Sequence, residues 1–197
     1  MEEKIKTASQ NNRQSQKRND VSRQKPKSKI ASFWEKNPNG IGSIVNMRAV
    51  LKWAMRYYLD TNILAFILFY KDKEDNFDDN TALILTDYSN LFFVSTVVIR
   101  ELLLLYKEGV FSSVTYNTYK NYQAIFAAIE ETGIEIKPVT KQHLFSYAAL
   151  VLAENHKDPN DHMIISQAIS DKIPLISSDK KFKLYATQGL QFVYNKR

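Results

Sequence analysis

The stretch MRYYLDTNIL, residues 55–64, contains an aromatic and apolar run that ends abruptly on a carboxylate. Residues 56–59 have the composition of a buried β-strand. Asp60 follows directly, and Thr61 and Asn62 lead into a second apolar run that extends to residue 70. Ligands of open α/β sheets bind beyond the carboxyl ends of the strands, which is where Asp60 would lie. A single aspartate after a strand is more often a helix N-cap, so Asp60 alone assigns no function.

Apolar runs of strand type alternate with helical patterns from residue 56 to residue 194. This alternation is typical of an α/β fold in which helices cover both faces of a mainly parallel sheet. The strands are expected at 56–59, 91–94, 134–139, 174–177 and 190–194. The helices are expected near 62–70, 80–88, 96–108, 113–131, 141–155 and 161–171.

The net charge of +6 is concentrated at the N-terminus. Residues 1–30 contain nine Lys or Arg and three Asp or Glu, which accounts for the whole excess. Their polar composition predicts a disordered basic tail. The rest of the chain is neutral, so no strong overall field attracts an acidic partner to it.

Composition excludes several classes of protein. The chain has no cysteine, which rules out disulfides and thiolate zinc sites. The N-terminus lacks the apolar segment of a signal peptide. The longest apolar run, 63–70, is far shorter than the roughly 20 residues of a membrane span. We therefore expect a soluble, cytoplasmic protein with no membrane contact.

Residues 31–54 differ from the polar tail because they contain aromatic anchors and an amphipathic pattern. Ile44, Met47, Leu51 and Ala54 fall on one helical stripe. Such a segment is either a docking peptide or an extra helix packed on its own domain, and the pattern alone favours neither. The predicted organisation is thus a tail (1–30), an amphipathic extension (31–54) and an α/β domain (55–197).

Two further acids, Asp179 and Glu101, are candidates for the same site. Asp179 has the same position relative to a strand as Asp60, and Glu101 carries a charge that needs a compensating partner. Asp179 follows the expected strand 174–177, as Asp60 follows the first strand. Glu101 shares its expected helix face with apolar neighbours at i−4, i+3 and i+4. A charge on the apolar stripe of a core helix is costly unless something compensates it. A metal ion is one candidate for that partner.

Asp161 has both a structural and a functional explanation. In the sequence DPND, Asp158 suits the N-cap, Pro159 the first helical position and Asp161 the first turn. An acid in the first turn complements the helix dipole. Asp161 also shares the face of Ile164 and Ile165, however, so its carboxylate is expected at the edge of the core.

Four carboxylates gathered at one end of a sheet repel one another. A pair about 4 Å apart costs roughly 4 kcal/mol at an effective dielectric of 20. Either the pKa values rise or a divalent cation neutralises the charges. Oxygen ligands suit Mg²⁺ or Mn²⁺, and such an ion can activate water for hydrolysis of a phosphodiester.

The ordered set YYLDTNIL, VSTVVIRELLLL, HKDPNDHMIISQAI and IPLISSDKKF resembles PIN-domain endoribonucleases, and most closely the VapC-type toxins of toxin–antitoxin modules. The resemblance covers residues 56–194. It implies a PIN-like three-layer α/β/α sandwich, a Mg²⁺ (or Mn²⁺) cofactor and hydrolytic cleavage of RNA. It also implies a cognate antitoxin as partner and a homodimer.

The resemblance assigns roles to individual residues. Asp60, Glu101, Asp161 and Asp179 would be the catalytic and metal-binding acids. Thr61, Asn62 and Ser178 occupy positions that commonly support the site through hydrogen bonds. Lys180, Lys181 and Lys183 flank Asp179 and are either phosphate contacts or the solvated start of a helix.

The chain departs from the family pattern at His162, where these toxins often have arginine. We expect His162, His143 and His156 to be surface imidazoles without a metal role. Met55 resembles the usual start of such a toxin, so the segment before it resembles an antitoxin tail that restrains the nuclease. The alternative function is a catalytically silent PIN scaffold or RNA-binding module, which the presence of all four acids disfavours. A phosphatase of the haloacid dehalogenase type would need an acid at Asn62.

Overall fold

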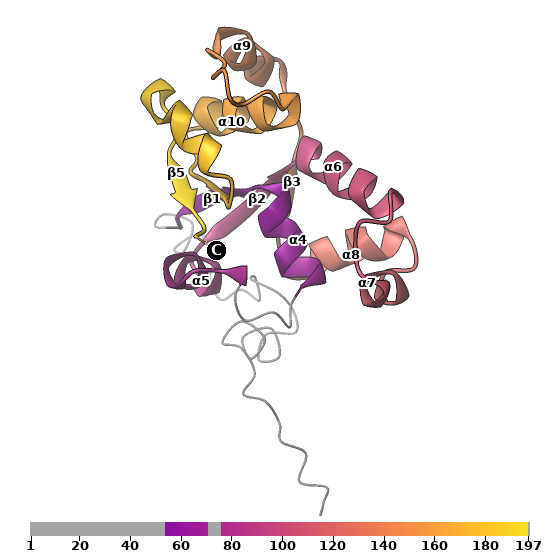
Figure 1. Cartoon of the computed structure of the whole chain (residues 1–197). Helices are drawn as coiled ribbons and strands as arrows, with labels where there is room; N and C mark the ends of the chain where they lie inside the picture. Colours follow the sequence, from indigo (N-terminus) through magenta and orange to yellow (C-terminus); the bar gives the residue numbers. More distant parts are fainter. Residues whose placement is uncertain (1–53, 71–75, 197) are drawn as a thin grey trace, which may run out of the picture.

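A computed structural model describes residues 54–70 and 76–196 of the chain, and Figure 1 shows the arrangement of its elements. The predicted tail (1–30) and all but the last residue of the predicted extension (31–54) lie outside the described residues. The elements in chain order are β1 (Arg56–Leu59), α4 (Thr61–Phe69), α5 (Asp79–Thr86), β2 (Leu91–Ser95), α6 (Thr96–Lys107), α7 (Ser113–Thr118), α8 (Tyr122–Thr132), β3 (Glu135–Lys137), α9 (Lys141–Ala149), α10 (Pro159–Asp171), β4 (Leu175–Ser177), the 3₁₀ helix η2 (Lys180–Gln188) and β5 (Phe192–Tyr194).

The five strands form one sheet in the order β3-β2-β1-β4-β5, and every neighbouring pair is parallel. This confirms the predicted α/β class. The register pairs Leu59 with Ile176 and Ser177 with Tyr194. The carboxyl ends of β1, β4 and β5 therefore lie next to one another at one edge of the sheet.

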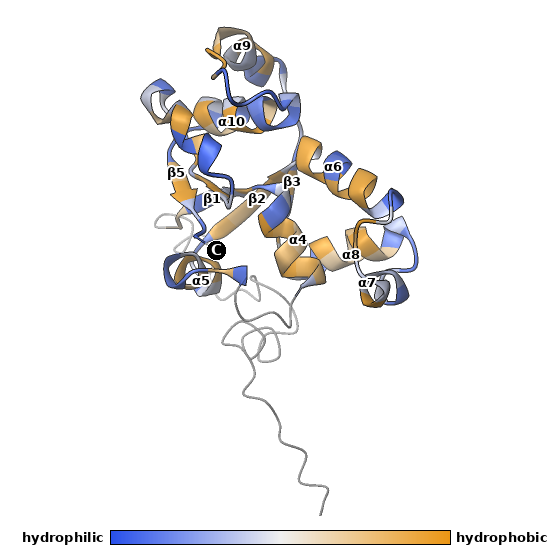
Figure 2. Cartoon of the chain, in the orientation of Figure 1, coloured by the Kyte–Doolittle hydropathy of each residue, from blue (hydrophilic) through white to orange (hydrophobic). Residues whose placement is uncertain are grey.

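Helices lie on both faces of the sheet, with α9 and α10 on one side and α4 on the other (Figure 1). Figure 2 shows that α4 is almost entirely hydrophobic beyond its first residues. Seven of its residues are buried, as expected for a helix that is apolar on all sides. On the opposite face, the Tyr58 hydroxyl donates to Asp171 Oδ2 of α10 at 2.6 Å.

The long helix predicted over 113–131 is two helices, α7 and α8. Asn121 starts α8 because its side-chain oxygen accepts a hydrogen bond from the Ala124 amide at 2.9 Å. Tyr119 ends α7, and its hydroxyl donates to the carbonyl of Leu68 at 3.0 Å. A tertiary contact with α4 thus interrupts a pattern that is helical in period.

The helix predicted over 141–155 ends at Ala149. The backbone N–H and carbonyl of Val151 pair with the side-chain amide of Gln188, both at 2.9 Å. Gln188 belongs to η2, of which the sequence suggested only a possible start at the lysines after Asp179. The backbone groups of Val151 therefore bond to a distant side chain instead of extending the helix.

Candidate active site

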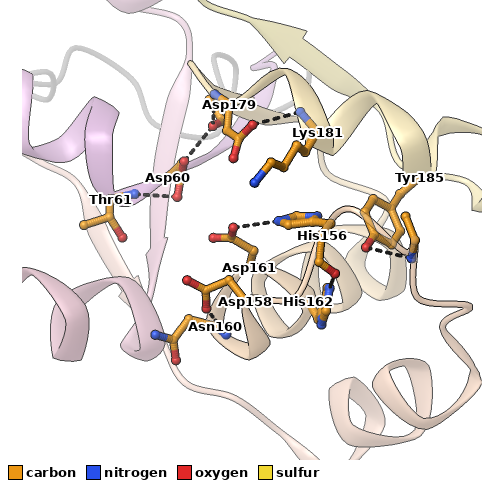
Figure 3. Close-up of polar contacts among 12 residues, drawn as sticks. Asp60, Thr61, His156, Asp158, Asn160, Asp161, His162, Asp179, Lys181 and Tyr185 are labelled. Carbon is orange, nitrogen blue, oxygen red and sulfur yellow. Dashed lines mark hydrogen bonds and ion pairs between the residues drawn. The ribbon is translucent and has the colours of Figure 1, made fainter.

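The four predicted acids lie at the carboxyl end of the sheet. Asp60 follows β1, Asp179 follows β4, Asp161 lies in the first turn of α10, and Glu101 lies in α6. Figure 3 shows Asp60, Asp161 and Asp179 pointing toward a common space. Parallel register brings the first strand and the fourth strand together, although Asp60 and Asp179 are far apart in the sequence.

Asp60 is 4% exposed and is held by a dense set of donors. Its Oδ1 accepts from the Thr61 amide at 2.7 Å, which makes Asp60 the N-cap of α4. Its Oδ2 accepts from the Ser177 hydroxyl at 2.6 Å and from the side-chain amide of Asn62. The predicted N-cap role and the predicted site position are therefore compatible, because both carboxylate oxygens are fixed at the sheet edge.

Glu101 lies at the margin of the core rather than on its most buried stripe, which corrects the expected helix face. The buried residues of α6 are Val98, Ile99 and Leu102, whereas Leu104 is 43% exposed. Glu101 is half-buried, and its Oε2 accepts from the Thr61 hydroxyl at 2.7 Å. Thr61 thus bridges Asp60 and Glu101, with its amide on one acid and its hydroxyl on the other.

The electrostatics of the cluster favour neutralisation of the acids. Burial raises the pKa of Asp60 to about 7, and repulsion from Asp161 and Glu101 adds to the effect of burial. Burial also raises the pKa of Asp161 to about 7, with repulsion from Asp158, Glu101 and Asp179 adding to it. Burial raises the pKa of Glu101 as well. These shifts show that the acids lie close enough to interact, and that a nearby cation would stabilise their ionised forms.

Asp158 caps the N-terminus of α10, as predicted. Its exposed side chain accepts from the Asn160 amide at 2.8 Å through Oδ1. Its charge is among the causes that raise the pKa values of Glu101 and Asp161. Asp158 therefore adds to the negative potential of the site from its rim.

His156 is a site residue that sequence reasoning missed. It is 2% exposed, and its Nε2 lies 2.7 Å from Asp161 Oδ2. Donor atoms of His156, Asp161 and Asp179 all lie within 4.8 Å of one another, so these three described residues could hold a metal ion together. Asp60 and Glu101 are not in this trio, so the four predicted acids are not equally close. The only sequence signal was the nearness of His156 to the DPND segment.

His162 holds His156 in place. Its Nε2 donates to the carbonyl oxygen of His156 at 2.9 Å, and the two rings meet edge to face at 5.1 Å. Both are buried, as is His143, whose Nε2 bonds to Asp171 Oδ1 at 2.9 Å. The expectation of three surface imidazoles was wrong, because the helices around α10 enclose all three rings.

The supporting residues bind one another across the sheet edge. Thr61 and Asn62 contact the acids directly, and Asn62 Oδ1 also accepts from the Ser178 amide at 3.2 Å. The Ser178 hydroxyl bonds to Asn195 instead of an acid. Ser177 is the serine that reaches the cluster, because its hydroxyl donates to Asp60 and accepts from the Asp179 amide at 2.9 Å. No pattern in the sequence favours Ser177 over Ser178.

The three predicted lysines are exposed residues of η2. Asp179 caps this helix, since its Oδ1 accepts from the Lys181 amide at 2.8 Å. Figure 3 shows the side chain of Lys181 extending toward the space between Asp179 and Asp161. Its charge lowers the pKa of Asp161, against the larger effect of burial. Lys180 and Lys183 face a separate cavity on the β5 side of η2.

The donor set fits a hard divalent cation. Carboxylate oxygens from several elements meet at one edge, and oxygen ligands suit Mg²⁺ or Mn²⁺. The His156 Nε2 bonds to Asp161 Oδ2, and such a bond from an outer residue orients a carboxylate ligand. Of the residues that could hold such an ion, Asp161 and Asp179 gather with His156 within 4.8 Å, and Asp60 and Glu101 lie outside that group.

Residues 57–188 match the PIN domain family. The match covers more than half of the chain, and the chain belongs to this family. No curated protein matches it.

Two solved structures that contain VapBC proteins are similar to the chain. A chain of VapBC2 from Rickettsia felis, bound to a promoter DNA fragment, is 21% identical with a TM-score of 0.50, over 72% of this chain and 100% of that one. A chain of DNA-bound VapBC from Salmonella typhimurium is 17% identical with a TM-score of 0.51, over 71% of this chain and 98% of that one. At these identities the likeness concerns the fold. Among residues 54–70 and 76–196, none of the helices has the length and apolar character needed to cross a bilayer.

Proposed function

We propose that the chain is a Mg²⁺- or Mn²⁺-dependent endoribonuclease that hydrolyses RNA phosphodiester bonds. The observation that carries the proposal is the meeting of buried Asp60 and half-buried Asp161 at the carboxyl edge of the sheet, where the pKa values of both are raised to about 7. Gathering like charges where they are wholly or partly removed from water is costly unless a cation accompanies them. Membership of the PIN domain family supports nuclease chemistry at this position.

The residues around Asp60 preorganise the proposed site. Thr61, Asn62 and Ser177 direct three donors at its two oxygens, so the carboxylate cannot rotate. The hydroxyl of Thr61 orients Glu101 in the same way. A divalent ion bound there would supply an activated water and stabilise the charge that develops on the phosphate. The residues of the chain supply the rigid geometry that such a reaction requires.

The lysines supply the substrate's counter-charge. Lys181 extends toward the cluster from η2, so its ammonium group lies where a phosphate would approach the acids. The body of the chain carries no net charge, so local cations rather than a global field must hold the strand. RNA is the proposed substrate because single strands present their phosphates and bases without a duplex to open.

The decisive experiment is cleavage of RNA by the purified chain with Mg²⁺, with Mn²⁺ and with EDTA. We expect cleavage with either metal, none with EDTA, and none from an Asp60→Asn variant that binds RNA normally. Full activity in EDTA would contradict the proposal. Sequencing of the RNA ends after expression of residues 55–197 in cells would identify the cleaved site.

We also propose that the protein is the toxin of a cytoplasmic toxin–antitoxin pair, with a cognate antitoxin and a homodimeric state. The similar chains from VapBC complexes support the class, because those assemblies carry both components. Co-expression with the product of the neighbouring gene, followed by size-exclusion chromatography with light scattering, tests both partners. The proposal of a homodimer and an antitoxin would be contradicted if the protein were a monomer and no co-expressed protein inhibited its RNA cleavage.

Residues 31–54 are proposed to restrain the nuclease, in cis or between chains. Ile44, Met47 and Leu51 offer an apolar stripe, and Arg48 offers a cation for the acids. Attachment raises the local concentration of such a segment to about millimolar. A protein starting at Met55 should cleave RNA faster than the full chain, and Arg48→Ala with Leu51→Ala should mimic it. Equal rates across dilution would show that the segment is no inhibitor.

A further inference from the structure

A cavity of about 440 Å³ lies between η2 and the edge strand β5. Its volume is within the range of about 300–1,000 Å³ that is typical of small-ligand sites. The lining combines two kinds of side chain, lysines from η2 and aromatic rings from β5. The lining residues are Lys180, Lys183, Ala186, Phe192 and Tyr194.

The aromatic wall of this cavity is rigid. Phe192 and Tyr194 are two residues apart in β5 and so lie on the same face of the strand, with ring centroids 6.1 Å apart. Phe192 packs at 6.0 Å against Phe182, which is completely buried. Beyond Tyr194, the buried Asn195 donates its backbone N–H to the Ser177 carbonyl at 2.9 Å. Both aromatic rings of β5 are half-buried, so part of each remains accessible to a ligand.

A cation lies over one of these rings. The Lys180 ammonium nitrogen is 5.9 Å from the centroid of Tyr194. Lys183 faces the same cavity one turn further along η2. Neither lysine forms a salt bridge among the described residues, so both charges are available to an anionic ligand.

The strand that lines the cavity pairs with the strand whose serine binds Asp60. Tyr194 pairs with Ser177 in the parallel register of β5 and β4, and neighbouring strands lie about 4.8 Å apart. The Ser177 hydroxyl donates to Asp60 Oδ2 at 2.6 Å. Lys180 directly follows Asp179 in the chain. An RNA strand bound across the acids therefore reaches this cavity within a short distance of the bond that is cleaved.

We propose that the cavity binds one nucleotide of the RNA strand, beside the nucleotides whose bond is cleaved. The inference rests on the proposed ribonuclease function. Tyr194 stacks on the base, and Lys180 and Lys183 contact the flanking phosphates. Single-stranded nucleic acids are held by this combination of aromatic platforms and cations. The site gives the enzyme affinity that its neutral surface does not provide.

The test measures RNA binding and RNA cleavage separately on the full chain. Binding of a labelled oligonucleotide is followed by fluorescence anisotropy in EDTA, and cleavage is followed with Mn²⁺. Tyr194→Leu keeps an apolar side chain against Phe192 but removes the aromatic face. Tyr194→Phe keeps the ring, and Tyr122→Ala removes an exposed aromatic ring from α8 as a matched control. Circular dichroism verifies that each variant is folded.

Tyr194→Leu should weaken binding roughly 5- to 100-fold, the loss expected for one stacked base. Tyr194→Phe and Tyr122→Ala should bind like the unmodified chain. Lys180→Gln and Lys183→Gln should each reduce the salt dependence of binding by about 0.7 in the log–log slope. A series of oligonucleotides, each lacking one base, should reveal the position that stacks on Tyr194. Removing that base should lower the affinity of the unmodified chain for RNA but leave the affinity of Tyr194→Leu unchanged.

Two outcomes would overturn the inference while leaving the proposed function intact. One is cleavage by the unmodified chain together with normal RNA binding by Tyr194→Leu. The other is full additivity at every position, in which removing a base lowers the affinity for RNA by the same factor in Tyr194→Leu as in the unmodified chain. Failure of the proposed ribonuclease function would give a different result. The unmodified chain would then bind RNA through Tyr194 but would not cleave it.

Discussion

The Nε2 of His156 lies 2.7 Å from Oδ2 of Asp161, and both residues belong with Asp179 to a group whose donor atoms lie within 4.8 Å of one another. The imidazole is buried, and burial lowers its pKa below the usual value. It is therefore neutral near pH 7 and donates from Nε2 to the carboxylate. His162 supports this arrangement, because its Nε2 donates to the backbone carbonyl of His156. Asp161 is thus an acid whose orientation is set by a second residue.

Loss of His156 should weaken the proposed metal site. We expect His156→Ala to reduce Mn²⁺ affinity about 10- to 100-fold, the usual effect of removing an outer partner of a metal ligand. Isothermal titration calorimetry measures the affinity directly, and RNA cleavage at saturating Mn²⁺ should recover much of the activity. His143→Ala is the matched control, since His143 is also buried against an aspartate but pairs with Asp171. Equal losses in the two variants would argue for a purely structural role.

Asp60 should make the metal-free protein less stable as the pH rises. Its folded pKa is raised from 3.8 to about 7, so folding favours the protonated form. The unfolded chain ionises first, and the free energy of unfolding therefore falls as pH rises from about 4 to about 7. The total loss is on the order of 4 kcal/mol, at about 1.4 kcal/mol per pKa unit.

Asp60→Asn carries no such ionisation. In EDTA, its stability relative to the unmodified chain should therefore increase across the same pH interval, as measured by urea denaturation at pH 5 and pH 8. Mn²⁺ should stabilise the unmodified chain at pH 8 and have little effect on the variant. A stability difference that does not change between the two pH values would contradict the assigned shift.

Glu101 and Glu108 offer a matched pair on one helix. Glu101→Gln should reduce RNA cleavage more than about 100-fold, beyond the loss expected for an outer residue alone. The amide oxygen can still accept from the Thr61 hydroxyl, so the melting temperature should change little. Glu108→Gln alters an exposed residue at the C-cap of α6 and should cleave normally. Comparable activity in the two variants would place the site elsewhere.

Lys181 should contribute to RNA binding rather than to the fold. Lys181→Gln is expected to raise the KM for RNA several-fold and to reduce the salt dependence of binding by about 0.7 in the log–log slope. Lys120→Gln changes an exposed lysine between α7 and α8 and serves as the control. Steady-state cleavage across a range of KCl concentrations measures both effects. An unchanged slope for Lys181→Gln would show that this lysine makes no phosphate contact.

The sequence by itself determined the alternation of strands with helices and the positions of Asp60 and Asp179 after two of the strands. Both acids follow short apolar runs, and local composition is sufficient to recognise a buried strand and its end. The parallel class followed from alternation of strands and helices. Helix ends were less predictable, because Tyr119 and Val151 form their hydrogen bonds with residues in other elements.

Only the tertiary structure decided which side chains complete the site. Ser177 rather than Ser178 reaches Asp60, because the pleat of β4 directs alternate residues to opposite faces and the register with β1 selects one of them. His156 joins Asp161 because the loop before α10 folds back over the first turn of that helix. Tyr194 lies opposite Ser177 because β5 pairs with β4. Each of these contacts depends on how the elements pack, which no periodicity within a single element records.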